Sequence, residues 1–198
     1  MIKIGILGDI GSGKSYIAKL FGYPVFNADK EVSKLYKKDK KVFLKLKKVL
    51  PKYLRSFPVK KQEISKAILS NKSNLNKIVK IVHHEVRKKM KIFLKKNELQ
   101  KIVILDIPLL LENKINEKND ILIFVQSKKS EVTKRLKKRK NFNTKIFNKF
   151  KSLQLPLDYK KKKCHFVIKN NFLKKTVKKN VKIILSKIFI NERNSIRY

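Results

Sequence analysis

Eight residues near the N-terminus restrict the fold more than any other part of the chain. Gly8-Asp9-Ile10-Gly11-Ser12-Gly13-Lys14-Ser15 matches G-x-x-x-x-G-K-[ST], the pattern of a phosphate-binding P-loop. The apolar run 1–7 before it predicts a buried strand, and residues 16–21 after it predict the start of a helix. Because the pattern needs this strand–loop–helix order, we expect a P-loop here and not a glycine-rich turn followed by a chance Lys-Ser.

The residue types in this stretch suit phosphate. Its three glycines lack a Cβ, so the backbone can turn tightly and bring N–H groups close to phosphate oxygens. A helix that starts near Lys14 directs the positive end of its dipole at the same anion. The Lys14 ammonium can reach the β- and γ-phosphates, and the Ser15 hydroxyl is the expected Mg²⁺ ligand. We therefore predict a site for a nucleoside triphosphate with Mg²⁺.

Apolar runs and helical periodicity alternate along the rest of the chain. Further strands are predicted at 24–26, 102–106, 121–125 and 165–168. Helices are predicted at 29–36, 62–69, 75–93, 131–140, 145–153 and 173–188. This alternation indicates the α/β class, with a parallel sheet of five strands and helices on both faces. The lysine run 160–163 carries no specific signal.

Two predicted strands end in an aspartate, at the sheet edge where ligands bind in α/β folds. Asp29 follows the second strand. It could take or orient the proton of an acceptor hydroxyl, or hold Mg²⁺; equally, it could be the N-cap of the next helix. Asp106 ends a continuous apolar strand, which is the form of a Walker B strand whose carboxylate supports Mg²⁺.

Two groups of basic residues are candidates for binding substrate phosphates. His83 and Arg87 are four residues apart on the long predicted helix and share a face. Arg135 and Arg139 are expected on one face of the 131–140 helix, in a position where small P-loop kinases carry a lid that closes over the phosphates. In a chain this rich in lysine, a solvated basic surface is the favoured interpretation of the His83 and Arg87 pair and a serious alternative for the two arginines.

The net charge is extreme, since 53 Lys and Arg oppose 14 Asp and Glu in 198 residues. Nucleic-acid binding is one interpretation. The other is compositional bias, which we favour because the lysines are spread along the whole chain and do not form one stripe. The single cysteine suits a reducing cytoplasm, and no apolar run is long enough to span a membrane. We expect neither a membrane nor a specific nucleic acid as partner.

Several further motifs, taken with the P-loop, resemble one enzyme family. They are Phe26-Asn27-Ala28-Asp29, His83 on a long helix, Pro108-Leu109-Leu110-Leu111-Glu112-Asn113, Arg135-Leu136-Lys137-Lys138-Arg139, Gln154-Leu155-Pro156 and Val167-Ile168-Lys169-Asn170-Asn171. In this order and spacing they resemble the dephospho-CoA kinases, the last enzymes of coenzyme A synthesis. The P-loop alone is generic, whereas the combination is specific and covers nearly the whole chain.

The resemblance implies a single P-loop kinase domain that moves the γ-phosphoryl of ATP to the ribose 3′-hydroxyl of dephospho-CoA. It implies a core at 1–36, 100–133 and 164–190, a helical substrate region at 37–99 and a lid at 134–160. A cytoplasmic monomer is expected.

The resemblance also assigns roles to individual residues. Gly11, Ser12, Gly13, Lys14, Ser15 and Tyr16 would hold the ATP phosphates. Asp29 would be the base or acceptor-orienting group, and Lys14 and Arg139, with Arg135 as a weaker candidate, would stabilise the transferring group. His83 and Arg87 would receive dephospho-CoA, and Ser15 and Asp106 would serve Mg²⁺.

Four positions depart from the family pattern. Asp9 stands in place of Gly, Tyr16 in place of Thr, His84 in place of Pro, and Lys169 in place of Asp. Asp9 brings a carboxylate close to the phosphates and Lys169 alters a strand end near the adenine site, but none of the four removes a P-loop residue or Asp29. The alternatives are another small nucleotide or nucleoside kinase and a basic nucleic-acid-binding protein with a vestigial P-loop.

Overall fold

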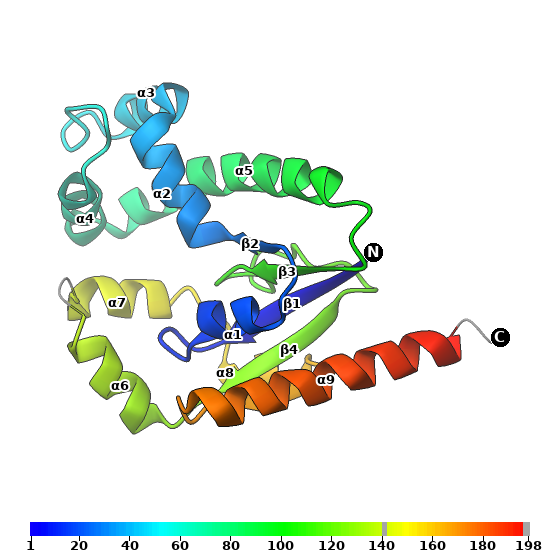
Figure 1. The fold of residues 1–198 in the computed structure, drawn as a ribbon. Helices are drawn as coiled ribbons and strands as arrows, with labels where there is room; N and C mark the ends of the chain where they lie inside the picture. Colours follow the sequence, from blue (N-terminus) through cyan, green and yellow to red (C-terminus); the bar gives the residue numbers. More distant parts are fainter. Residues whose placement is uncertain (140–141, 196–198) are drawn as a thin grey trace. The chain divides into compact units, whose positions relative to one another are not determined.

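A computed structural model describes residues 1–139 and 142–195, with side chains up to 192. It contains a five-stranded sheet in the order β2-β3-β1-β4-β5 (Figure 1). The strands are β1 (Ile2–Gly8), β2 (Val25–Asn27), β3 (Ile102–Asp106), β4 (Ile121–Gln126) and β5 (Phe166–Lys169). β1 pairs in parallel with β3 and β4, and β4 pairs in parallel with β5. All five predicted strands are confirmed, each to within one or two residues.

The chain divides into two compact units. The first holds residues 1–26, 99–142 and 151–198, and the second holds 27–98 and 143–150. The expected helical substrate region at 37–99 corresponds most closely to the second unit, which also takes in the helix after β2. The expected lid at 134–160 is divided between the two units, and residues 140 and 141 within it lie outside the described residues.

The first unit is built on the sheet. One face is covered by α1 (Lys14–Leu20) and α9 (Lys174–Ser195), which pack on each other. The other face of β1 meets Leu110 from the turn after β3, and the short helix α8 (Leu157–Lys162). α6 (Lys129–Lys137) follows β4. The core between sheet and helices contains Ile4, Ile6, Ile17, Ala18, Ile102, Ile104, Ile123, Val125, Ile168, Val177 and Val181.

The second unit is helical. It contains α2 (Ala28–Lys38), α3 (Lys40–Val49), α4 (Lys61–Ser70), the long α5 (Lys72–Lys96) and most of α7 (Thr144–Lys151). α5 contacts α2, α3 and α4 through an apolar stripe of Leu75, Ile78, Val82 and Val86. Lys149 on α7 donates to the carbonyl of Ile68 at 2.6 Å, near the C-terminal end of α4, where the helix dipole favours a cation.

Two sequence-based interpretations need correction. The 160–163 lysine run includes the end of helix α8, and Lys160 is fully buried. α6 ends at Lys137, so Arg139 lies beyond the helix and does not share a helical face with Arg135. The helix ends because its last turn tightens: the N–H of Arg139 bonds the carbonyl of Leu136, three residues back and not four.

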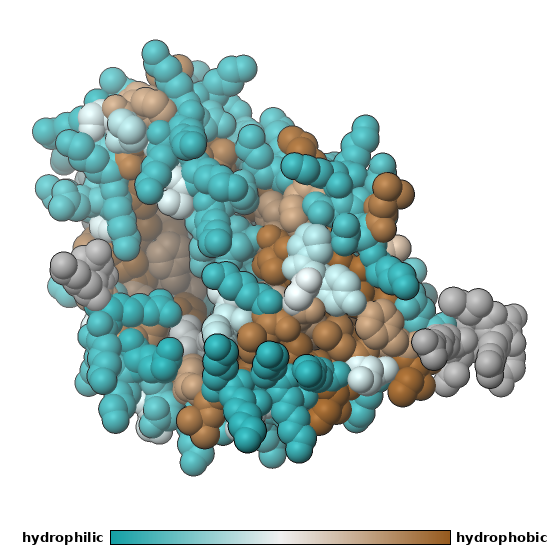
Figure 2. Space-filling model, viewed as in Figure 1, coloured by the Kyte–Doolittle hydropathy of each residue, from teal (hydrophilic) through white to brown (hydrophobic). Residues whose placement is uncertain are grey.

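The surface is dominated by hydrophilic side chains. Figure 2 shows them spread over the visible face, with groups of apolar side chains among them. Within the described part of the chain, no helix combines the length and the apolar character needed to cross a membrane.

Candidate active site

The loop between β1 and α1 adopts a conformation that depends on glycine. Gly8, Gly11 and Gly13 have φ angles of +144°, +85° and +92°. Residues with a Cβ rarely adopt such angles, and at Gly8 and Gly13 a Cβ would also collide with neighbouring atoms. Gly13 is the N-cap of α1 and no side chain caps this helix end. The predicted strand–loop–helix arrangement is therefore confirmed.

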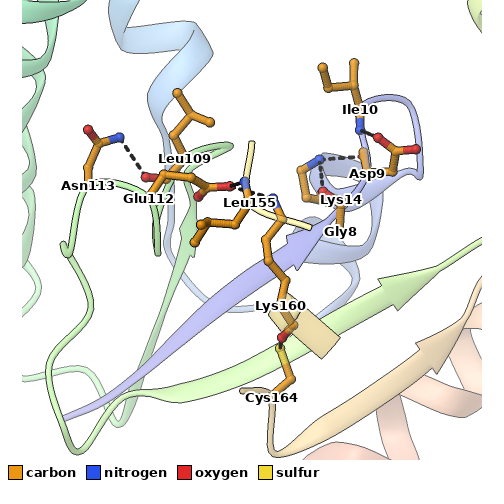
Figure 3. A network of polar contacts seen from close by, with 10 residues as sticks. All are labelled: Gly8, Asp9, Ile10, Lys14, Leu109, Glu112, Asn113, Leu155, Lys160 and Cys164. Carbon is orange, nitrogen blue, oxygen red and sulfur yellow. Dashed lines mark hydrogen bonds and ion pairs between the residues drawn. The ribbon is translucent and has the colours of Figure 1, made fainter. Parts of the chain in front are cut away.

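Lys14 is held against this loop. Its ammonium donates to the carbonyls of Gly8 at 3.1 Å and Asp9 at 2.7 Å, and the residue is 9% exposed (Figure 3). The Asp9 carboxylate accepts from the N–H of its neighbour Ile10 at 2.7 Å. The additional acid in this loop is thus engaged by the loop backbone, and a positive charge is fixed beside the glycines.

The back of the loop is attached to the ends of two other strands. The carbonyl of Ser12 accepts from the side-chain amide of Asn170 at 2.7 Å and from the Ser127 hydroxyl at 3.0 Å. Ser127 follows β4 and Asn170 follows β5. Both contacts were missed in the sequence analysis. Each polar residue comes directly after a buried strand, and Asn170 also belongs to the motif 167–171 quoted above, but neither signal names the partner.

Helix α6 also packs on the loop. A Cβ on Gly11 would lie 3.0 Å from Leu136 and 3.1 Å from Val132, two buried residues of α6. The guanidinium of Arg135 lies over the ring of Phe172 at 4.4 Å, a cation–π contact beside Asn170. Arg135 therefore lies on a helix that packs against the P-loop, and its role toward the phosphates stays a prediction.

The two expected Mg²⁺ ligands belong to the same unit as the loop. Ser15 is exposed in the first turn of α1, and Asp106 ends β3 with 2% of its surface exposed. Gly5 on β1 is opposite Leu105 on β3, and the two strands are parallel. Asp106 therefore lies at the carboxyl end of the sheet, where β1 leads into the loop. A hydroxyl and a carboxylate are oxygen donors of the kind that Mg²⁺ prefers. These residues, with the uncapped helix end and Lys14, fit a Mg²⁺-triphosphate.

The Glu112 carboxylate connects two of the quoted motifs, 108–113 and 154–156, and forms a buried ion pair with Lys160. The Glu112 carboxylate accepts from the Lys160 ammonium at 2.8 Å and from the N–H of Leu155 at 3.0 Å (Figure 3). Lys160 is fully buried, and Cys164 donates its thiol proton to the carbonyl of Lys160 at 3.2 Å. The turn after β3 is thereby joined to the segment that enters α8.

Three of the remaining candidates, Asp29, His83 and Arg87, lie in the helical unit, and Arg139 lies in the first unit. Asn27, not Asp29, is the N-cap of α2, since its side chain accepts from the N–H of Lys30 at 2.8 Å. This removes the capping alternative for Asp29, which is exposed in the first turn of α2. His83 and Arg87 lie on α5, half-buried and exposed respectively. Arg139 is exposed in the first unit.

The departures from the family pattern lie at accessible positions. Tyr16 is 42% exposed on α1, and His84 is exposed on α5. Lys169 is exposed at the end of β5, where its carbonyl accepts from the side chain of Asn180 at 3.3 Å.

Comparison with known families identifies the chain's relatives. The family model described as dephospho-CoA kinase matches residues 2–175. The chain belongs to the dephospho-CoA kinase family. Among curated members, that of Wolbachia sp. subsp. Brugia malayi is 32% identical over 95% of this chain and 98% of its own length. The member from Rickettsia felis is 31% identical over 95% of this chain and all of its own length.

Solved structures agree with the architecture of this family member. TT1252 from Thermus thermophilus is 26% identical, with a TM-score of 0.76 over 94% of this chain and 97% of its own. Dephospho-CoA kinase from Campylobacter jejuni, at 19% identity, covers 94% of this chain and 96% of its own with a TM-score of 0.63. A shikimate kinase from Bacteroides thetaiotaomicron, at 10% identity, reaches 0.51 over 94% of this chain and 98% of its own. The P-loop kinase fold is therefore confirmed.

Proposed function

We propose that this chain transfers the γ-phosphoryl group of ATP to the ribose 3′-hydroxyl of dephospho-CoA, giving coenzyme A and ADP. Membership of the dephospho-CoA kinase family, over residues 2–175, is the observation that carries this conclusion. The P-loop supplies the part of the chemistry that concerns the phosphate donor. We further propose that the enzyme works in the cytoplasm as a monomer, which suits its lone cysteine.

The donor side of the reaction belongs to Gly11–Tyr16. The backbone N–H groups of this segment bind the triphosphate, and the Lys14 ammonium moves from the carbonyls of Gly8 and Asp9 to the β- and γ-phosphates. Ser15 and Asp106 would hold Mg²⁺, which would neutralise charge on the phosphate oxygens. Arg139 adds positive charge at the transferring group, with Arg135 as a weaker candidate.

The acceptor side is assigned to residues of the helical unit. His83 and Arg87 bind dephospho-CoA, and Asp29 orients the 3′-hydroxyl and receives its proton. Because phosphoryl transfer needs little covalent participation by the protein, positioning and charge stabilisation account for most of the catalysis. Asn27 caps α2, so the N-cap alternative no longer competes with this assignment.

The deciding experiment measures ADP release from Mg-ATP with dephospho-CoA, AMP, cytidine or shikimate as acceptor. We expect release that depends on dephospho-CoA. Release with AMP or cytidine alone would keep the mechanism and replace the substrate by a nucleotide or nucleoside. Turnover with none of the acceptors would overturn the proposal.

Two substitutions test the assigned roles. Lys14→Ala should abolish most turnover, and near-normal activity would exclude the P-loop assignment. Asp29→Asn should lower kcat at least about tenfold while the KM for ATP changes little, because it removes an interaction needed in the transition state. If only the KM for ATP changed, Asp29 would not be the group that handles the hydroxyl.

A further inference from the structure

We propose that Asn170 is a positioning residue that fixes the Ser12–Gly13 peptide in the orientation needed to bind a nucleotide phosphate. The proposal rests on the proposed function only in taking the loop as the ATP site. It adds a residue outside the P-loop motif whose side chain controls the geometry of that motif. Ser127 contributes to the same task from β4.

Hydrogen bonds hold both the backbone and the side chain of Asn170 in place. It is 3% exposed, and its backbone N–H donates to the carbonyl of Gln126 at 2.8 Å. Its side-chain nitrogen donates to the Ser12 carbonyl at 2.7 Å, and its side-chain oxygen accepts from the N–H of Phe172 at 2.9 Å. A flipped amide would place oxygen against oxygen and N–H against N–H, so only one orientation satisfies both neighbours.

This contact determines where the next N–H group of the loop points. In a trans peptide the C=O and the following N–H point in opposite directions. The Ser12 carbonyl is held toward the ends of β4 and β5 by Ser127 and Asn170. The N–H of Gly13 must therefore point away from those residues. An unanchored peptide could rotate and present its carbonyl to a phosphate, which would repel the anion.

The loop and Asn170 also depend on each other sterically. A Cβ on Gly13 would meet the side-chain nitrogen of Asn170, so the amide occupies space that only a glycine leaves free. Gly13 has a φ of +92°, an angle that glycine adopts without strain. The backbone N–H of Phe172 donates to the side-chain oxygen of Asn170. The Arg135 guanidinium lies 4.4 Å from the centre of the Phe172 ring.

Asn170→Asp is the most informative variant, with ATP binding measured by calorimetry in the absence of dephospho-CoA. Its carboxylate can accept from Phe172 but cannot donate to the Ser12 carbonyl. We expect the Kd for ATP to rise at least about tenfold relative to the unmodified protein near neutral pH, where the introduced carboxyl group is ionised.

Asn171→Asp is the matched control. It introduces the same charge one residue away, at an exposed position whose side-chain oxygen accepts from the N–H of Leu173 at 3.1 Å. We expect a Kd ratio near one. An equal loss of ATP affinity in both variants, or no loss in Asn170→Asp, would overturn the proposal.

Ser127→Ala tests the same carbonyl if Asn170→Asp fails to fold. We expect a severalfold rise in the Kd for ATP with the KM for dephospho-CoA unchanged, and an unchanged ATP affinity would overturn the proposal. The outcomes also separate the two proposals. If the variants bind ATP as expected but the unmodified protein does not phosphorylate dephospho-CoA, the proposed function is rejected and the role of Asn170 stands. If the unmodified protein phosphorylates dephospho-CoA and Asn170→Asp binds ATP normally, the role of Asn170 is rejected and the proposed function stands.

Discussion

Gly13 shows how much of the site depends on a missing side chain. Alanine there has to adopt a left-handed φ, at a cost of about 1–2 kcal/mol, and its methyl group has to displace Asn170. We expect Gly13→Ala to lower the affinity for ATP at least about tenfold, since the peptide orientation is lost as well. Calorimetric titration with ATP measures this loss directly.

Gly22 offers the matching control. It has a φ of +77°, but a Cβ there would meet nothing within 4 Å. Gly22→Ala should therefore cost similar stability through backbone strain and leave ATP affinity unchanged. If both variants bound ATP equally well, the collision with Asn170 would have no part in binding.

Cys164 is the only cysteine in the chain, and we expect it to react slowly with thiol reagents. Burial raises the pKa of its thiol to about 12, although the Lys160 ammonium acts in the opposite direction. At about pH 8 the folded protein should contain a roughly thousandfold smaller thiolate fraction than the unfolded chain. Because the thiolate is the reactive form, the folded protein should react more slowly by about this factor. Thiol titration with and without urea measures the ratio of rates, and equal rates would contradict the pKa.

The same shift has a consequence for stability in alkali. The folded-state pKa of this thiol lies above its unfolded value of 9.0, so between these values the unfolded state loses its proton first. The contribution of Cys164 to stability is therefore complete below pH 9 and decreases as the pH rises toward 12.

Among the elements, α8 depends most clearly on one ion pair. Lys160 is fully buried and its ammonium pairs with Glu112. We expect Lys160→Met to lower the free energy of unfolding by about 3–5 kcal/mol, because it leaves a buried carboxylate without its cation. Urea denaturation measures the change. Lys161→Met, on an exposed neighbour, should have little effect.

A second substitution distinguishes the loss of charge from the loss of packing. Adding Glu112→Leu to Lys160→Met removes the isolated carboxylate, so most of the stability should return. If the double variant were as unstable as Lys160→Met alone, the packing around α8 and not the ion pair would hold the helix.

The strands and the long helices were predictable because their apolar residues recur with periods that one sequence reveals. α8 was not, since residues 157–162 contain one leucine and three lysines and no apolar stripe. Only the distant Glu112 explains the burial of Lys160. The position of Arg139 beyond α6 was missed for a related reason: a run of helix-forming lysines does not show where the last turn tightens.

The residues of the candidate site also fall into a group that local sequence patterns predict and a group that they do not. The loop residues 8–15 and Asp106 follow local patterns, so the sequence predicts them. Asn170 and Ser127 act on a residue 158 and 115 positions away, and only the pairing of β4 with β5 and with β1 brings these contacts about.

At the scale of the whole molecule, the net charge of +39 opposes compaction. Added salt screens repulsion between exposed charges over about 8 Å at physiological ionic strength. We expect the thermal midpoint to rise as NaCl increases from about 10 mM to about 300 mM, which a melting series measures. A midpoint that fell with NaCl would indicate that attractive ion pairs outweigh the repulsion.

The salt dependence of nucleic-acid binding distinguishes two explanations of the basic surface. If it is only compositional, binding to nucleic acid should be weak and should fall steeply with salt. Filter binding to a DNA duplex at rising NaCl measures the slope. Tight binding that persists at physiological salt would instead indicate a specific nucleic-acid partner.

The order of the sheet has a consequence for how the protein is made. β1 is synthesised before β3 and β4, which are its partners in the sheet. Ile2 therefore cannot pair with Ile102, nor Ile4 with Ile121, until about a hundred further residues have been added. Contacts so distant in sequence close slowly, and an apolar segment that waits for them is open to aggregation. While the ribosome is still adding the helical unit, residues 2–8 have no sheet to enter. We therefore expect this short segment to need protection from aggregation during translation.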